Sequence, residues 1–145
     1  MKNELFVLDA HTGFWDASKE NSKNRFGDAF IETFYAFHTG FNPPEKRWTM
    51  DYESQFRKVD PDWYLEEVFI KGDADMSILS TQVLMDFYHT GFCNADRNAL
   101  MRARAPKRII SLGGVDPRMP KAVDEVTRQI TDCGVLGFKW YTAEW

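Results

Sequence analysis

Short apolar runs separated by amphipathic stretches make up most of the chain. Four of these runs are predicted to be strands, at 5–8, 76–83, 108–115 and 135–142. A continuous apolar run, in contrast to strict alternation, is typical of a strand buried on both faces of a parallel sheet. We therefore expect a buried parallel sheet with polar side chains at the ends of its strands.

Helix signals lie between these runs. Asp60 can cap a helix, Pro61 suits its first position, and Gly72 stands where a left-handed C-terminal residue is expected. The clearest helical spacing of apolar residues runs from Val123 to Cys133. The predicted helices are 61–71, a second from 94 or 95 to about 105, and 120–134.

A long segment, 14–59, separates the first predicted strand from the first of these helices. It holds eleven of the aromatic residues of the chain, which has 5 Trp, 5 Tyr and 12 Phe in all. One short helix, 28–38, is predicted within it. The aromatic side chains either roof a pocket for an apolar or aromatic substrate, or pack the insertion against the rest of the chain or another subunit.

The order of elements is strand, insertion, helix, strand, helix, strand, helix, strand. This is a βαβ series, which predicts an α/β fold with a parallel sheet. Right-handed crossovers can build either an open doubly wound sheet or part of a (β/α)8 barrel. The chain of 145 residues fits one domain, 1–145.

Composition narrows the range of partners. The chain is 43% hydrophobic and 28% charged, with a net charge of -4, so neither nucleic acid nor an anionic membrane is an expected partner. No apolar run approaches the roughly 20 residues that span a bilayer. Two cysteines, Cys93 and Cys133, indicate free, buried thiols in a reducing compartment, and we expect a cytoplasmic protein.

Three short motifs at strand ends resemble one known family. The first strand leads into Asp9-Ala-His-Thr-Gly-Phe-Trp15, the third closes with Gly114-Val-Asp-Pro117, and the last contains Gly137-Phe-Lys-Trp-Tyr141. Together these resemble the N-terminal half of the amidohydrolase-related family. That resemblance implies strands 1–4 of a TIM-type (β/α)8 barrel, with a long insertion after strand 1.

The same resemblance implies metal chemistry. Family members are mostly metal-dependent hydrolases and nonoxidative decarboxylases, and His11 matches the first histidine of their His-x-His metal pair. Gly13 stands in the place of the second histidine and has no donor atom. The expected cofactor is a divalent metal, zinc by preference, with His11 as one ligand. The family's later histidines and its aspartate would lie in the other half of the barrel.

Four further residues are candidates for a substrate pocket at the strand ends, namely Trp15, His89, Asp116 and Lys139. Each has a purely structural alternative. Asp116 can serve the turn before Pro117, Lys139 can pair with Asp116, and His89 can be a solvated loop histidine. The tetrapeptide His-Thr-Gly-Phe occurs at 11–14, 38–41 and 89–92 with unequal spacing, and we interpret it as coincidence.

The leading functional hypothesis is a fragment of an amidohydrolase-related enzyme. It would hydrolyse a C–N or C–O bond, or decarboxylate an aromatic acid, on a small-molecule substrate. A full barrel needs about 250 residues, so the isolated chain is expected to be inactive. The alternative is a complete, noncatalytic half-barrel that self-associates, and a homo-oligomer is expected because four strands leave two exposed edges. A third hypothesis is a doubly wound binding domain.

Overall fold

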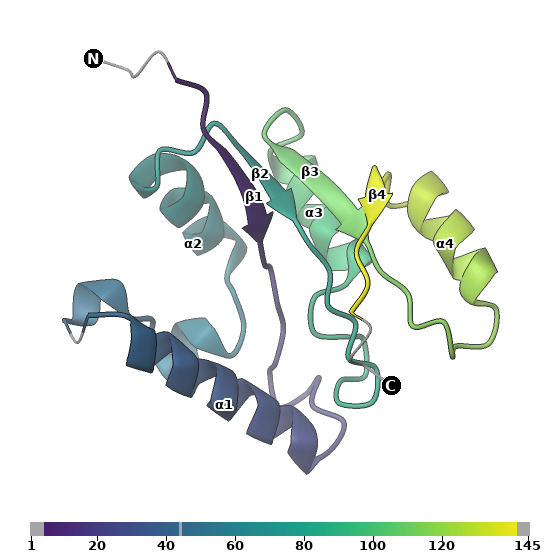
Figure 1. Cartoon of the computed structure of the whole chain (residues 1–145), viewed down its shortest axis with the longest axis horizontal. Coiled ribbons are helices and arrows are strands. Elements are labelled where there is room, and N and C mark those ends of the chain that lie inside the picture. The colour runs from purple at the N-terminus through teal and green to yellow at the C-terminus, as the bar shows by residue number, and fades with distance from the viewer. Residues whose placement is uncertain (1–4, 44, 142–145) are drawn as a thin grey trace.

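The computed structural model describes residues 5–43 and 45–141 and contains one parallel sheet. Its strands follow one another in space in the order β1-β2-β3-β4 (Figure 1). Ser77 of β2 pairs with Asp9 of β1 and with Ile109 of β3, and Leu112 pairs with Gly137. The strands are β1 (Leu8–Thr12), β2 (Met76–Leu79), β3 (Ile109–Gly113) and β4 (Gly137–Phe138).

The prediction for the first strand was wrong in its position. The apolar run 5–8 only leads into β1, and the strand proper consists of the more polar residues Leu8–Thr12. Leu5 and Phe6 are exposed, at 76% and 66%, rather than buried. The register explains the shift, because β1 extends along β2 and forms one edge of the described sheet. The other three strands lie within their predicted runs but are shorter.

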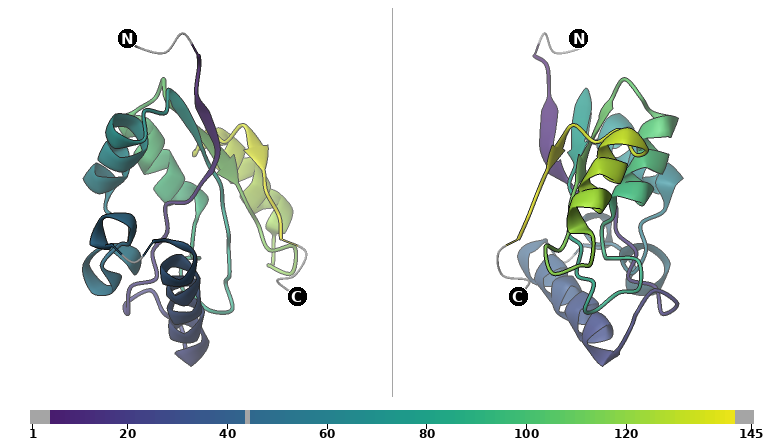
Figure 2. Two further views of the ribbon diagram at one scale, coloured as in Figure 1. Left: turned by 60° about the vertical axis from the view of Figure 1, so that its left-hand side comes forward. Right: turned by 90° about the vertical axis from the view of Figure 1, so that its right-hand side faces the viewer.

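The crossover helices all lie on one face of the sheet (Figures 1 and 2). That arrangement, with sequential parallel strands, is the pattern of a barrel wall and not of a doubly wound sheet, in which helices cover both faces. The opposite face of the sheet is turned toward the viewer in Figure 1. The helices are α2 (Pro61–Leu65), which continues as the π-helix η3 (Glu66–Lys71), α3 (Ala95–Arg104) and α4 (Ala122–Thr131).

The predicted helix ends are partly confirmed. The Asp60 carboxylate caps α2 by accepting hydrogen bonds from the backbone of Asp62 and Trp63. Gly72 is not left-handed, since its φ is -80°, so that part of the prediction was wrong. Glycine is needed there for close approach, because a Cβ would lie 2.8 Å from the carbonyl oxygens of Glu67 and Val68.

A hydroxyl network joins the first two strands to α2. The Tyr64 hydroxyl lies 2.7 Å from Thr12 Oγ1 and 3.0 Å from Ser77 Oγ, while Thr12 donates to the carbonyl of Ile78. Burial raises the pKa of Tyr64. Around this network lies the apolar core between sheet and helices, whose buried members include Phe14, Val59, Phe69, Leu79, Met101 and Ile109. Thr12 therefore points to the helix side, and the adjacent His11 points to the open face.

The insertion packs against the loop before α3 in a second core, whose buried members are Ala17, Ile31, Phe56, Tyr88, Phe92 and Cys93. The predicted helix 28–38 is confirmed and is longer, α1 (Arg25–Phe41), with Asn24 as its cap. Two short helices follow, η1 (Lys46–Trp48) and η2 (Tyr52–Phe56). Figure 1 shows α1 crossing beyond the carboxyl ends of the strands. The insertion thus stands at the edge of the sheet where barrel enzymes place their sites.

Apolar side chains are exposed at both ends of the sheet. At the β1 end these are Leu5 and Phe6; at the β4 end, Val123 and Leu136 are 78% and 73% exposed, and Ile130 is 51% exposed. The apolar stripe that predicted α4 is therefore largely uncovered. No helix in the described ranges is long and apolar enough to cross a membrane.

Candidate functional site

His11 and Lys139 meet on the open face of the sheet at its carboxyl edge. His11 lies in β1 and Lys139 directly follows β4, so they come from opposite ends of the strand order. The Nζ atom of Lys139 contacts Nε2 of His11. An ammonium group has no lone pair, so it donates and the imidazole accepts, which places the imidazole proton on Nδ1. Two residues singled out separately from the sequence therefore form one polar centre.

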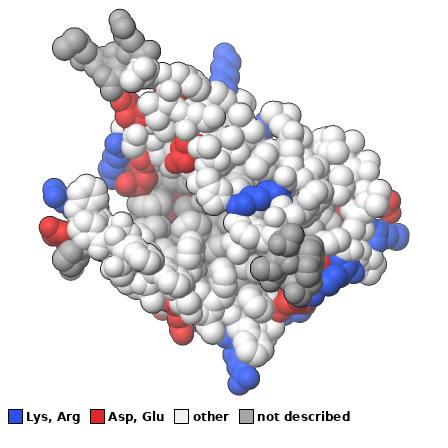
Figure 3. All heavy atoms as spheres, in the orientation of Figure 1, with Lys and Arg blue, Asp and Glu red and all other residues white. Residues whose placement is uncertain are grey.

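Tyr141 completes this centre. Lys139 Nζ donates to the Tyr141 hydroxyl over 2.5 Å and lies 4.4 Å from the centre of the ring. Residues two apart in an extended segment point to the same side, which is how Lys139 and Tyr141 come together. Tyr141 was not among the predicted site residues, although this Lys-x-Tyr alternation was a usable signal. Much of the surrounding face is uncharged (Figure 3).

Backbone contacts fix the position of Lys139. Its amide donates to the carbonyl of Gly113 over 2.9 Å, and that carbonyl also accepts from Thr81 Oγ1 over 2.7 Å. Gln129 of α4 clamps the next residue, Gly114, by bonding both its N–H and its C=O over 3.0 Å. The ends of β2, β3 and β4 are thus tied together by bonds that are mostly buried.

Asp116 lines the same small cavity as Lys139, but its carboxylate is hydrogen-bonded to Arg118. Its carboxylate accepts hydrogen bonds from the Arg118 guanidinium at 2.6 and 3.0 Å and from the Arg118 backbone at 2.9 Å. The Arg118 guanidinium lowers the pKa of Asp116. The alternative in which Asp116 pairs with Lys139 is therefore wrong, because each has a nearer partner. Both residues nevertheless line the same narrow cavity of about 10 Å³.

Trp15 lies in the aromatic core of the insertion. Its ring stacks on Phe92 with centroids 5.8 Å apart and meets Phe34 and Phe56 edge-on at 5.6 and 5.4 Å. Its indole N–H donates to the carbonyl of Phe56 over 2.5 Å. The packing interpretation of these aromatics accounts for the contacts seen. A part of the ring surface remains exposed, and its role as a pocket wall stays a prediction.

The three His-Thr-Gly-Phe copies adopt three different structures. The first ends β1, the second lies in α1, and the third lies in the loop before α3. His89 is exposed in that loop, where its backbone donates to Asn21. His38 lies in α1, and its Nε2 accepts a hydrogen bond from the backbone N–H of Met50 over 2.9 Å. The tetrapeptide is not a structural repeat.

The described residues do not by themselves fit the expected zinc site. Protein zinc sites use three or four protein ligands, and among residues 5–43 and 45–141 no group of three or more His, Cys, Asp or Glu side chains could hold a metal ion. His11 is in contact with a lysine, and position 13 is glycine. A Cβ added at Gly13 would lie 3.2 Å from the Trp15 ring and 3.8 Å from Cys93 Sγ.

Comparison with known proteins gives independent information about the fold. No protein-family model matches the chain, and no curated protein matches it significantly. An uncharacterized TIM-barrel protein from Bordetella bronchiseptica is similar in structure, with a TM-score of 0.50 and 12% identity over 90% of this chain and 42% of that one. 4-Oxalomesaconate hydratase from Rhodopseudomonas palustris matches with a TM-score of 0.41 and 11% identity, over 92% of this chain and 40% of that one.

The chain thus spans about two fifths of the length of these solved structures. Three observations indicate the same fold: the strand order, the position of the crossover helices on one face of the sheet, and the structural similarity to the Bordetella bronchiseptica protein. The chain has the α/β fold of half of a TIM barrel.

Proposed function

We propose that the chain supplies half of the barrel of an amidohydrolase-related enzyme, and that a small-molecule substrate binds at the His11–Lys139–Tyr141 centre. The observation that carries this proposal is the contact between His11 and Lys139 at the carboxyl edge of the sheet. Barrel enzymes hold their catalytic groups at that edge. Both side chains are also exposed there or partly so, and therefore accessible to a ligand.

The chemistry of the centre favours an anionic substrate group. The Lys139 ammonium can donate three hydrogen bonds, and His11 and Tyr141 account for two. A substrate carboxylate would take the third and compete with the imidazole for the lysine. The freed Nε2 of neutral His11 would then accept a proton from the reacting group, as a general base does. Hydrolysis of a C–N or C–O bond suits these roles, because the base takes the proton of the attacking water. Decarboxylation of an aromatic acid would use the centre in the opposite sense, because the ring carbon that loses CO2 gains a proton, which a protonated His11 would supply.

Zinc-dependent activity would require further metal ligands besides the described residues. His11 can supply one imidazole ligand, and at least two further ligands would have to come from elsewhere. Lys139 would first have to release Nε2 of His11. We therefore assign the binding and proton-transfer roles to this chain's own residues and route no step through a metal.

A panel assay tests the proposal. The isolated chain is expected to be inactive, so binding is measured: the purified protein is titrated with aromatic carboxylic acids and their amides, with and without added zinc. For any carboxylate that binds, Lys139→Met should raise the dissociation constant at least about tenfold, the scale of one lost hydrogen bond to a charged group, whereas the matching amides should bind more weakly from the start. Lys107→Met is the matched control, because it removes an exposed cation far from the carboxyl edge. Equal affinity of the Lys139→Met variant and the unsubstituted protein would overturn the assignment.

A second candidate function is a noncatalytic half-barrel that self-associates. The exposed apolar residues at both ends of the sheet favour it. Two copies with four strands each could close an eight-stranded barrel. Light scattering at several concentrations tests this version: a dimer that Leu136→Asp converts to a monomer supports it. A well-behaved monomer in the unsubstituted protein would eliminate it.

A further inference from the structure

Lys139 differs in its surroundings from the other lysines whose exposure the structure describes. Its side chain is half-buried at the carboxyl edge of the sheet. The others are all exposed, namely Lys19, Lys23, Lys58, Lys71, Lys107 and Lys121. An ammonium group is strongly hydrated, so lysine side chains normally stay in water. Lysines that act as nucleophiles are, by contrast, found in partly desolvated positions of this kind.

The partners of the Lys139 side chain are neutral. Its Nζ contacts Nε2 of His11 and donates to the Tyr141 hydroxyl over 2.5 Å. Asp116 lines the small cavity beside it, but that carboxylate accepts from the Arg118 guanidinium at 2.6 and 3.0 Å. Among residues 5–43 and 45–141, no carboxylate forms an ion pair with Lys139. The local carboxylate charge is thus balanced by the arginine, not by the lysine.

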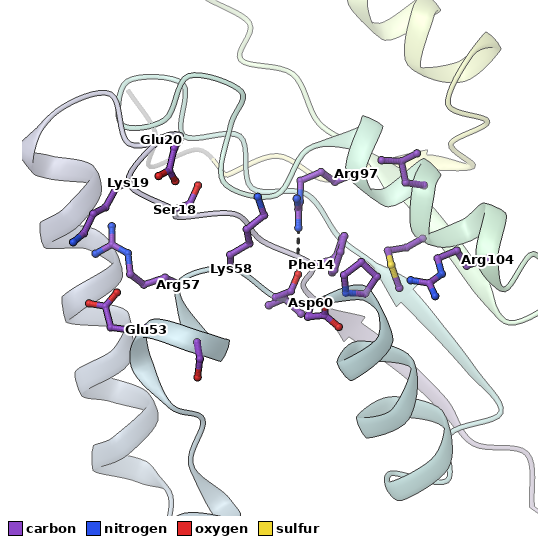
Figure 4. A pocket seen from close by; sticks show the side chains of 15 residues that line it. Phe14, Ser18, Lys19, Glu20, Glu53, Arg57, Lys58, Asp60, Arg97 and Arg104 are labelled. Carbon is purple, nitrogen blue, oxygen red and sulfur yellow. Dashed lines mark hydrogen bonds between the residues drawn. The ribbon is translucent and has the colours of Figure 1, made fainter.

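Two lysines that line other cavities are held by carboxylates. Lys58 lines a cavity of about 580 Å³ between the insertion and α3 (Figure 4), and its Nζ lies 2.9 Å from Asp16. Lys71 bonds to Glu67 and Glu66 at 2.7 and 3.1 Å, and these hydrogen bonds raise its pKa. An ion pair favours the ammonium form, which has no lone pair and cannot attack a carbonyl carbon. Both of these lysines are therefore kept in the unreactive form.

We propose that Lys139 forms an imine with a small, uncharged aldehyde at the His11–Lys139–Tyr141 centre. The cavity beside Lys139 is narrow, about 10 Å³, which suits the carbonyl class with the least bulk at its carbon. Lys139 is the one cation among the described residues that line this cavity, and Asp116 lines it as well. A charged group on the aldehyde would therefore have no counter-ion there once the lysine has reacted.

The contacts supply each proton that the reaction moves. His11 Nε2, which accepts from the ammonium, takes one proton and leaves a neutral amine. The amine nitrogen attacks the carbonyl carbon, so a C–N bond forms as the C=O π bond breaks. A second proton then passes from this nitrogen to the oxygen and gives a carbinolamine. The Tyr141 hydroxyl accepts from Lys139, so its own proton is available for a hydrogen bond to that oxygen.

Loss of water completes the reaction. The imidazolium of His11 protonates the carbinolamine hydroxyl, which leaves as water while the nitrogen lone pair forms the C=N bond. The products are a protonated imine on Lys139, one water molecule and neutral His11. The reaction needs no oxidant or reductant, and the base is restored at the end.

Reductive trapping with acetaldehyde tests the proposal on the 145-residue chain. Sodium cyanoborohydride reduces a protonated imine to a stable secondary amine, so a lysine that reacts keeps an ethyl group, which peptide mass spectrometry locates. Near neutral pH and at low conversion, we expect Lys139 to be labelled at least about tenfold faster than the exposed Lys107. The ion-paired Lys71 should react no faster than Lys107. Labelling of Lys139 at or below the rate of Lys107 would overturn the proposal.

Two comparisons show whether the preference depends on the centre. His11→Ala removes the proton acceptor and should lower labelling of Lys139 at least about tenfold, while labelling of Lys107 stays unchanged. In urea the preference for Lys139 should vanish, because its contact with His11 exists only in the folded chain. Undiminished labelling of Lys139 in His11→Ala, with the fold intact by circular dichroism, would overturn the role of His11.

This inference uses the same side chains as the proposed function, yet the two can fail separately. Binding of a carboxylate needs the ammonium form of Lys139 and makes no covalent bond. Trapping needs the neutral amine and involves no carboxylate. Absence of trapping would therefore leave the carboxylate titration to be judged by itself, and weak carboxylate binding would not affect the labelling result.

Discussion

The imidazole of His11 accepts a hydrogen bond from the ammonium group of Lys139, although the two residues are 128 positions apart in the sequence. The contact spans the open face of the sheet between its first and last strands. It fixes which imidazole nitrogen carries the proton, because Nε2 must offer its lone pair. A base with a defined tautomer at the carboxyl edge of a half-barrel is the central chemical feature of this chain.

Replacing Lys139 should change the tautomer of His11. In the unsubstituted protein we expect the tautomer that carries its proton on Nδ1. Lys139→Met removes the donor to Nε2, so the proton should move toward Nε2. Long-range proton–nitrogen spectra of the imidazoles distinguish the two forms. Tyr141→Phe, which leaves the lysine in place, should keep the Nδ1 form, and identical spectra for all three proteins would contradict the assignment.

Removing the Tyr64 hydroxyl should destabilise the protein. Tyr64 is 3% exposed and bonds to Thr12 and Ser77; without it the buried Ser77 hydroxyl would lose this partner, while Thr12 would keep its bond to the carbonyl of Ile78. We expect Tyr64→Phe to lower the free energy of unfolding by about 1–3 kcal/mol, the cost of unsatisfied buried polar groups. Urea denaturation measures it. Tyr35→Phe is the comparison, since its one bond to Met50 is only partly buried; an equal loss there would argue against the burial effect.

Much of the sheet and its helices was predictable from local sequence. Three signals act over a few residues: capping at Asp60, the apolar spacing of α4, and the apolar runs of β2 and β3. The position of β1 could not be predicted locally, because it is set by pairing with β2, whose residues are about 70 positions away in the sequence. The exposure of α4's apolar stripe also escaped prediction, since periodicity identifies a face but not what covers it.

The site was predictable only in part. Strand-end position and family resemblance selected His11 and Lys139, yet nothing local said that they would touch. The choice of Arg118 as partner of Asp116 follows from a turn that brings the guanidinium back over two residues.

Acid should weaken the protein partly through Asp116. Arg118 lowers the folded-state pKa of this carboxyl, so its stabilising contribution is complete above its unfolded value, about 3.9, and is lost as the pH falls through the folded value. Asp116→Asn should therefore be less stable than the unsubstituted protein at pH 6, and the difference should shrink toward pH 2. Urea unfolding at several pH values measures this. Asp73→Asn, at an exposed position before β2, is the control, and a difference that stays constant with pH would refute the linkage.

The Cys93 thiol should be unreactive in the folded protein. Burial raises its pKa to about 12, so almost none of it is thiolate at pH 8. In a Cys133→Ser background, which leaves one thiol, we expect reaction with a disulfide reagent at least about 100-fold more slowly than for a free thiol of ordinary pKa. Denaturation in urea should restore the ordinary rate. A rapid reaction before unfolding would show that the thiol is accessible.

Restoring the missing histidine tests whether this strand end can hold a metal. Gly13→His would place a second imidazole two residues from His11, in the spacing that the family resemblance implies for a metal pair. The new Cβ would lie 3.2 Å from the Trp15 ring, which must give by a few tenths of an ångström. We expect zinc affinity to rise at least about tenfold, because two neutral imidazoles replace one, as measured by competition with a coloured chelator. The double variant His11→Ala/Gly13→His should lose that gain. If Gly13→His binds zinc no better than the unsubstituted protein while its fold is intact, His11 is not poised as a ligand, and its contact with Lys139 has to be explained by substrate binding or proton transfer without a metal.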